Sequence, residues 1–166
     1  MSLTQRRLER EFHTLRKNPT NGYHVELKCG DIFEWLGSLK GLKNSPYEGG
    51  TFNFCLRFTE EYPEKPPILK FTTRIYHPNV NGRTGAVRWN MLGKNWHHNN
   101  TMEKVMMSLR ALLDHPELQS TVDNGMATEF AYHRKRFFEH AKEWTEKCAM
   151  EEPASSPHMS VTAISG

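Results

Sequence analysis

Four short stretches of alternating apolar and polar residues follow one another between residues 23 and 73 of this chain. The clearest is TFNFCLRF at 51–58, in which Phe52, Phe54, Leu56 and Phe58 share one face. The others begin at Tyr23, Phe33 and Ile68. Because the stretches are consecutive and closely spaced, they predict a four-stranded antiparallel meander and not β-α-β units.

Helical patterns flank this sheet. Residues 3–17 are predicted to form a helix, because Leu8, Phe12 and Leu15 recur at helical spacing. Pro19 and Gly22 are expected to end it. A second helix is predicted from about residue 101, with Asn100 and Glu103 as a capping box. Its apolar face consists of Met102, Val105, Met106, Leu109 and Leu113.

One last helical stretch is predicted near the carboxyl end. Its apolar face is expected to carry Phe130, Phe137, Ala141, Trp144 and Cys148. Residues 75–100 show no clear period and read as a long loop of the kind that is often functional. The order of helix, four strands, loop and helices predicts an α+β fold. We expect one domain over 1–150 and a disordered tail over 151–166.

Composition excludes several other classes of protein. The 166 residues include three cysteines, none in a C-x-x-C pair, so neither a disulfide framework nor a zinc ribbon is expected. The net charge of +3 forms no dense basic stripe, which argues against nucleic-acid binding. No apolar run approaches the ~20 residues that cross a bilayer, and the start is charged from residue 6, so we expect neither a membrane segment nor a signal peptide. A monomer with reduced thiols, in the cytoplasm or the nucleus, is expected.

Several separate motifs occur in an order that resembles the ubiquitin-conjugating enzyme family. They are YPEKPP at 62–67, FTTRIYHPNV at 71–80, the later Trp96 and AKEWTEKCAM at 141–150. The likeness covers about residues 3–150 and is greatest to small, ligase-promiscuous members that consist of little but the catalytic domain. It implies an amino-terminal helix, a four-stranded antiparallel meander, an active-site loop, a central helix and carboxy-terminal helices.

The resemblance also implies a reaction. In the family, a cysteine shortly after His-Pro-Asn receives ubiquitin from an activating enzyme as a thioester, which a substrate lysine then attacks. The reaction needs a thiolate, because sulfur is nucleophilic near neutral pH and is a good leaving group. The family's Asn supports the developing oxyanion or orders the loop. His77 and Asn79 match this motif, and Ser120 lies near an acidic or serine gate position of the family.

The cysteine itself is missing at this place. Matching the family's pattern onto Gly85-Ala86-Val87 puts Arg88 at the position of the cysteine and Asn90 at that of an aspartate. A shift of one residue changes nothing, since no cysteine lies between Cys55 and Cys148. A guanidinium stays protonated and cannot form a thioester.

The remaining nucleophiles are weak substitutes. Cys55 is predicted to face away from the apolar stripe of its strand, and Cys148 to lie on the core face of the last helix, so both read as structural thiols. Thr84 could in principle form an ester, but no obvious base lies beside it.

Residues that resemble the family's ligase-docking elements are also altered. Arg6 and Arg7 match the basic residues of the first helix. Glu64 stands where similar members carry an aromatic residue, and His97 and His98 begin the segment that replaces a Ser-Pro-Ala turn. Because a few anchors carry most interface energy, we expect weak docking to RING-type ligases.

No cofactor and no metal site are expected. His77, His97, His98 and His115 invite a zinc hypothesis, but no cysteine or paired carboxylate completes a tetrahedron.

These observations predict a catalytically inactive protein of the ubiquitin pathway. It would act as a non-catalytic variant or regulator that binds ubiquitin, a conjugating enzyme or a ligase. Two alternatives remain. One is an active conjugating enzyme whose cysteine is replaced by Arg88 through engineering or error, because known non-catalytic variants usually also lack His-Pro-Asn. The other is an interaction scaffold outside the ubiquitin system.

Overall fold

The predicted meander is the centre of the fold. The computed structural model describes residues 1–17 and 22–150. The four strands are antiparallel and lie in chain order, β1 (Tyr23–Lys28), β2 (Asp31–Lys40), β3 (Thr51–Arg57) and β4 (Ile68–Phe71). The α+β prediction is therefore confirmed, while the predicted disorder of 151–166 and the predicted stop at Pro19 lie outside the described residues.

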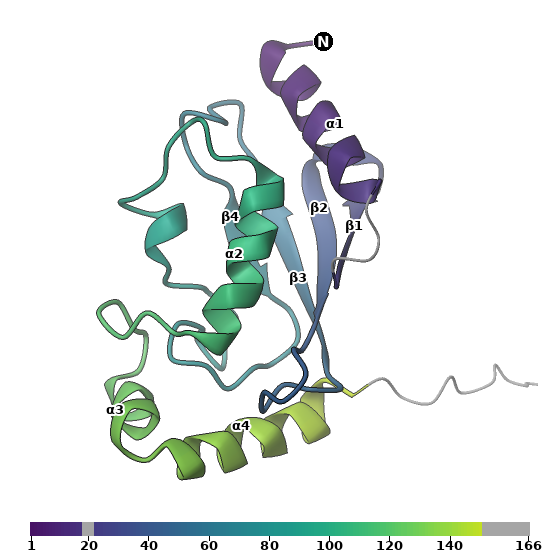
Figure 1. Cartoon of the computed structure of the whole chain (residues 1–166). Coiled ribbons are helices and arrows are strands. Elements are labelled where there is room, and N and C mark those ends of the chain that lie inside the picture. The colour runs from purple at the N-terminus through teal and green to yellow at the C-terminus, as the bar shows by residue number, and fades with distance from the viewer. Residues whose placement is uncertain (18–21, 151–166) are drawn as a thin grey trace, which may run out of the picture.

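The helices lie on one face of this sheet and at its two ends (Figure 1). They are α1 (Leu3–Arg16), α2 (Met102–Asp114), α3 (Asn124–Tyr132) and α4 (Arg134–Cys148), with a short 3-10 turn, η2 (Asn90–Leu92). Helix α2 covers one face of the sheet, α1 lies at one end of the molecule, and α4 lies at the other end. None of the helices in the described part of the chain is long and apolar enough to cross a membrane.

The core lies between α2 and the sheet. Every second side chain of β3 points into it, as the sequence predicts, and Phe52, Phe54 and Leu56 are at most 1% exposed. Gly37 of β2 pairs with Phe54, and a Cβ atom on Gly37 would lie 2.3 Å from the Phe54 ring. The absence of a side chain at residue 37 therefore lets the ring fill the space above its neighbouring strand.

Helix α2 begins one residue later than predicted. Its N-cap is Thr101, whose hydroxyl accepts a hydrogen bond from the backbone N–H of Lys104 at 3.2 Å. The predicted capping box of Asn100 and Glu103 is therefore wrong. Asn100 is buried, and its carbonyl accepts a hydrogen bond from Arg7 instead.

The last helical stretch is two helices. The chain breaks at His133, where φ is −135° and ψ is 55°, so Phe130 belongs to α3 and the rest to α4. The buried residues of α4 recur every four positions, at Phe137, Ala141 and Thr145, and the next step is Ala149. Cys148 is consequently exposed, and its predicted place on the core face is wrong.

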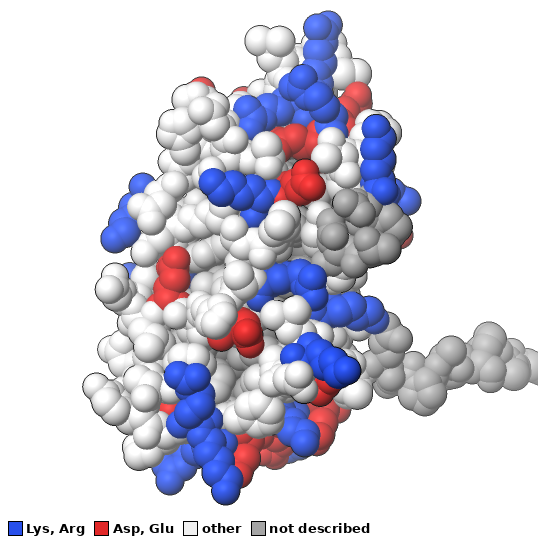
Figure 2. Space-filling model, in the orientation of Figure 1, with Lys and Arg blue, Asp and Glu red and all other residues white. Residues whose placement is uncertain are grey.

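Charged side chains are spread over the surface. Figure 2 shows Lys and Arg interspersed with Asp and Glu from the α1 end to the α4 end of one face.

Candidate functional site

The His77-Pro78-Asn79 turn lies at the centre of the candidate site. Its His and Asn are 0% exposed. The Nδ1 atom of His77 accepts a hydrogen bond from the backbone N–H of Asn79 at 3.0 Å, so Nε2 carries the proton and donates to the Leu112 carbonyl at 2.8 Å. Burial lowers the pKa of His77 to about 4. His77 is therefore a neutral residue that anchors this turn to the end of α2.

The Asn79 amide connects this turn to the segment after α2. Its Nδ2 atom donates to the carbonyls of Glu117 and Ser120 at 3.0 and 2.7 Å, and its Oδ1 atom accepts from the Glu117 backbone N–H at 2.9 Å. Both amide hydrogens are used in this way. Of the two roles that the resemblance implies for this residue, the geometry supports the ordering of the loop.

Further contacts join the same two segments, residues 77–90 and 117–122, which we call the site loops. The Val122 backbone N–H donates to the Pro78 carbonyl at 2.9 Å. The Glu117 carboxylate accepts from the Asn90 backbone N–H at 3.0 Å. No sequence pattern points to Glu117, because only the fold brings it next to Asn90.

Arg88 lies on the outer side of the site loops. Its backbone N–H donates to the Asn79 carbonyl at 2.7 Å, which fixes its main chain beside the central turn. Its side chain is exposed and donates to the Thr121 carbonyl at 3.3 Å. All five predicted catalytic residues therefore lie on the site loops. The Ser120 carbonyl accepts a hydrogen bond from Asn79, and Asn90 follows the buried Trp89.

The three cysteines lie elsewhere in the fold, and all are free thiols. Cys55 is half-buried on β3 and faces away from the core, as predicted. Cys29 is exposed in the turn after β1, and Cys148 is exposed at the end of α4. None of them is part of the site loops.

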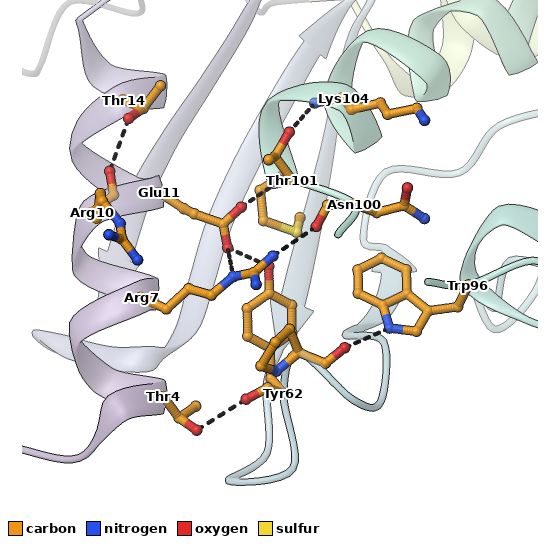
Figure 3. Close-up of polar contacts among 12 residues, drawn as sticks. Thr4, Arg7, Arg10, Glu11, Thr14, Tyr62, Trp96, Asn100, Thr101 and Lys104 are labelled. Carbon is orange, nitrogen blue, oxygen red and sulfur yellow. Dashed lines mark hydrogen bonds and ion pairs between the residues drawn. The ribbon is translucent and has the colours of Figure 1, made fainter. Parts of the chain in front are cut away.

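The segments that carry a second group of predicted site residues meet at the α1 end of the molecule. Trp96 donates from Nε1 to the Pro63 carbonyl at 2.8 Å, and the Thr4 hydroxyl donates to the Tyr62 carbonyl at 2.9 Å (Figure 3). These contacts bring together α1, the loop that carries Glu64 and the loop that carries His97 and His98. All three of these side chains are exposed, and the two imidazoles stack with centroids 4.4 Å apart.

The two arginines predicted for ligase binding are placed differently. Arg6 is exposed, whereas Arg7 pairs with Glu11 at 3.3 Å, donates to the Asn100 carbonyl at 3.1 Å and lies over the Tyr62 ring (Figure 3). Arg7 is therefore engaged inside the protein, and Arg6 is the arginine of this pair that faces outward.

Glu11 is a structural residue that is absent from the predicted sites. Its carboxylate accepts hydrogen bonds from the Tyr62 hydroxyl and, at 2.8 Å, from the Met102 backbone N–H at the start of α2. Burial, together with this carboxylate, raises the pKa of Tyr62 well above its usual range. The available signal was its spacing, because Glu11 follows Leu8 by three residues and precedes Leu15 by four, on the apolar face of α1.

The described residues contain no group of three or more His, Cys, Asp or Glu side chains placed to hold a metal ion. Both ring nitrogens of His77 are occupied by hydrogen bonds within the protein.

Comparisons with known proteins agree with this arrangement. A sequence model of the family described as ubiquitin-conjugating enzyme matches residues 7–145. A crystal structure assigned as a ubiquitin conjugating enzyme from Plasmodium yoelii is 30% identical and covers 92% of this chain and 99% of its own, with a TM-score of 0.83. The E2 domain of a Toxoplasma gondii ubiquitin conjugating enzyme is 32% identical and covers 87% of this chain and 98% of its own, with a TM-score of 0.79.

Proposed function

Since this chain belongs to the ubiquitin-conjugating enzyme family, we propose that it is a member without thioester chemistry, which acts by binding ubiquitin, a conjugating enzyme or a ligase. One observation carries the proposal. The loop that follows His77-Pro78-Asn79 presents Arg88, and no cysteine lies between Cys55 and Cys148. A guanidinium has no lone pair free for attack on an activated carboxyl group, so Arg88 cannot replace the cysteine.

The framework around the missing nucleophile supports a binding role. The Asn79 amide makes three hydrogen bonds to the segment after α2, and His77 is held at both ring nitrogens. These hydrogen bonds hold the site loops together although they contain little regular structure. A rigid surface lowers the entropic cost of docking a partner.

Docking to RING-type ligases is proposed to be weak. Glu64 adds a charge, and His97 and His98 add polar rings, at positions that the family resemblance assigns to ligase contact. Burying an unpaired carboxylate at an interface opposes binding. Arg6 remains available as a cation at this end of the molecule.

A charging assay tests the main proposal. The protein is incubated with activating enzyme, ubiquitin and ATP, and the products are separated on a non-reducing gel. We expect no thiol-sensitive ubiquitin adduct, whereas Arg88→Cys is expected to form one, if only poorly. A variant with Cys29, Cys55 and Cys148 all changed to Ser is the matched control, because a thioester on the unaltered chain must use one of these thiols. A thiol-sensitive adduct on the unaltered chain that disappears in this control would overturn the proposal.

A titration separates ubiquitin-pathway binding from a scaffold outside the pathway. The chain is labelled with ¹⁵N, and ubiquitin, an active conjugating enzyme and a RING domain are added in turn. We expect localised amide shifts with at least one of these partners. No shifts with any of them at high concentration would favour the scaffold.

An active enzyme with a substituted cysteine is the second candidate. The buried, hydrogen-bonded His77-Pro78-Asn79 turn supports it, because known non-catalytic variants of the family usually lack His-Pro-Asn. The natural codon at position 88 decides the matter directly, and a cysteine codon would replace our main proposal.

A variant with the cysteine restored tests the proposed weak docking to RING-type ligases. Arg88→Cys alone is expected to discharge poorly with RING ligases, because Glu64 and the two histidines remain. Adding Glu64→Phe is expected to raise ligase-stimulated discharge about tenfold, since one buried aromatic anchor contributes this much or more. Robust discharge by the single variant would contradict our account of this surface.

A further inference from the structure

A hollow of about 330 Å³ lies beside the chain segment that leads to Arg88. One side is formed by the end of β4 and the residues that follow it, and the other by the turn at 81–85. Its polar lining includes Lys70, Thr72, Arg74, Asn81, Arg83 and Thr84. Nothing in the function proposed above uses it.

The hollow has a fixed framework. The Phe71 backbone N–H donates to the Gly85 carbonyl at 2.9 Å, and the Gly85 N–H donates to the Asn81 carbonyl at 2.8 Å. Asn81 Oδ1 accepts from the backbone N–H groups of Arg83 and Thr84, both at 2.9 Å. Gly85 has φ +79°, and a Cβ atom there would lie 1.8 Å from the Phe71 carbonyl oxygen. Only glycine lets the turn approach β4 this closely.

Three exposed cations surround this hollow, each from a different part of the framework. Lys70 lies on β4, Arg74 follows β4 and Arg83 lies on the turn. None of the ion pairs among the described residues involves them. The Arg74 guanidinium is positioned in advance, because it lies over the Trp144 ring at 5.2 Å and donates from Nε to the Gly82 carbonyl at 3.1 Å.

The chain segment that forms the hollow contains no carboxylate side chain. Residues 65–102 contain six Lys or Arg and no Asp or Glu. The packed helix α4 supplies Glu143 next to Trp144, but that carboxylate pairs with Lys147 at 2.8 Å. Glu34 of β2 lines a neighbouring hollow together with Lys70, and its ion pair is with Arg57 at 3.8 Å. No ion pair among the described residues therefore takes up the charges of Lys70, Arg74 and Arg83.

We propose that this hollow binds the phosphoryl group of a phosphorylated side chain on a protein partner. Two guanidinium groups and an ammonium supply charge-assisted donors of the kind that bind a phosphate dianion, and the threonine hydroxyls add donors. A volume of this size accommodates one such group with its stem. A nucleic-acid strand would need cations in a longer row to meet successive phosphates. The inference goes beyond the function proposed above and holds whether or not position 88 carries a nucleophile.

Fluorescence anisotropy with a labelled peptide tests the proposal. The probe is a nine-residue Gly/Ser peptide with one central phosphoserine, compared with its unphosphorylated form. We expect only the phosphorylated peptide to bind, with ¹⁵N amide shifts at residues 72–74 and 82–86. Arg83→Gln is expected to weaken binding about tenfold, because one charge-assisted contact is lost. Arg10→Gln, which removes the same charge from an exposed position on α1, is the matched control and is expected to change binding less than about twofold.

Several outcomes would overturn the proposal. Equal binding of the two peptides would exclude phosphate recognition. An effect of Arg83→Gln no larger than that of Arg10→Gln would place the binding elsewhere. Inorganic phosphate that competes as well as the phosphopeptide would assign the hollow to a free anion. Tighter binding of a single-stranded RNA nonamer with the same amide shifts would assign it to nucleic acid.

Discussion

Two buried polar clusters hold the loops of this protein, and their chemistry differs. At the site loops, the cluster of His77 and Asn79 consists of neutral groups, bonded mainly to backbone atoms of Leu112, Glu117 and Ser120. At the α1 end, the cluster of Glu11, Arg7 and Tyr62 is built around a carboxylate. The first orders irregular chain, while the second attaches α1 to the start of α2.

Because their chemistry differs, the two clusters are expected to respond differently to mutation and to pH. A neutral amide that loses its partners leaves unsatisfied backbone groups, which cost roughly 1–3 kcal/mol each when buried. A buried carboxylate that is removed leaves a cation without its counter-ion, and such losses are typically about 3–5 kcal/mol. The neutral cluster contains an imidazole and is therefore also sensitive to acid. The two clusters can be separated by mutation and by pH.

The largest loss of stability is expected on substitution of Glu11. Glu11→Ala removes the acceptor for Arg7, for the Tyr62 hydroxyl and for the Met102 backbone N–H. We expect the free energy of unfolding to fall by about 3 kcal/mol, toward the lower end for buried pairs because Arg7 is partly solvated. Urea unfolding followed by tryptophan fluorescence measures it. Glu139→Ala, at an exposed position on α4, is the matched control. Equal losses in the two variants would show that the charged cluster does not stabilise the fold.

A smaller loss is expected at Asn79. Asn79→Ala breaks three hydrogen bonds to the segment after α2 and is expected to lower the free energy of unfolding by about 2 kcal/mol. It should also raise hydrogen exchange at the Glu117 and Val122 amides more than in the strands. Asn99→Ala, at an exposed position, is the control. Unchanged exchange at these two amides would mean that the site loops are ordered by other contacts.

Acid is expected to destabilise the neutral cluster through His77. Its pKa is lowered by burial from 6.5 to about 4, so between these values the unfolded chain takes up a proton that the folded chain does not. Stability attributable to His77 is therefore complete above pH 6.5 and falls by about 1.4 kcal/mol per pH unit as the pH drops toward 4. Urea unfolding at several pH values measures the slope. His77→Gln should flatten this part of the profile, and the exposed His115→Gln should not. An unchanged slope in His77→Gln would contradict the assignment.

Much of the fold could be predicted because local patterns determine it. The alternation at 51–58 predicts β3 and its inward face, and closely spaced strands leave little choice but an antiparallel meander. The errors occur where two local signals compete. Asn100 and Thr101 can both cap a helix, and the structure uses the second. Cys148 lies one residue before the position that the four-residue repeat of α4 buries.

The candidate site was predictable in its residues and not in its contacts. His77 and Asn79 stand out as a motif, but the carbonyl groups that receive their hydrogen bonds are 35 to 41 residues away in the chain. Arg7 reads as a surface cation on a basic helix, since its partner Glu11 also resembles a surface residue. The spacing to Leu8 and Leu15 places Glu11 on the apolar face of α1, but only packing shows the partners that a buried carboxylate needs there.

Arg88 lies next to the neutral cluster of His77 and Asn79 but contributes little to it. Its side chain is exposed, and its hydrogen bond to the Thr121 carbonyl is long at 3.3 Å, while the backbone of the residue makes the shorter bond to Asn79. Arg88→Ala is expected to change the free energy of unfolding by less than about 0.5 kcal/mol, as at ordinary surface positions. Urea unfolding of this variant beside Asn79→Ala measures the contrast within one loop. A loss of stability comparable to that of Asn79→Ala would mean that the guanidinium holds the site loops together and that Arg88 has a structural role. A negligible loss would mean that the arginine changes the surface chemistry at position 88 and not the stability of the fold.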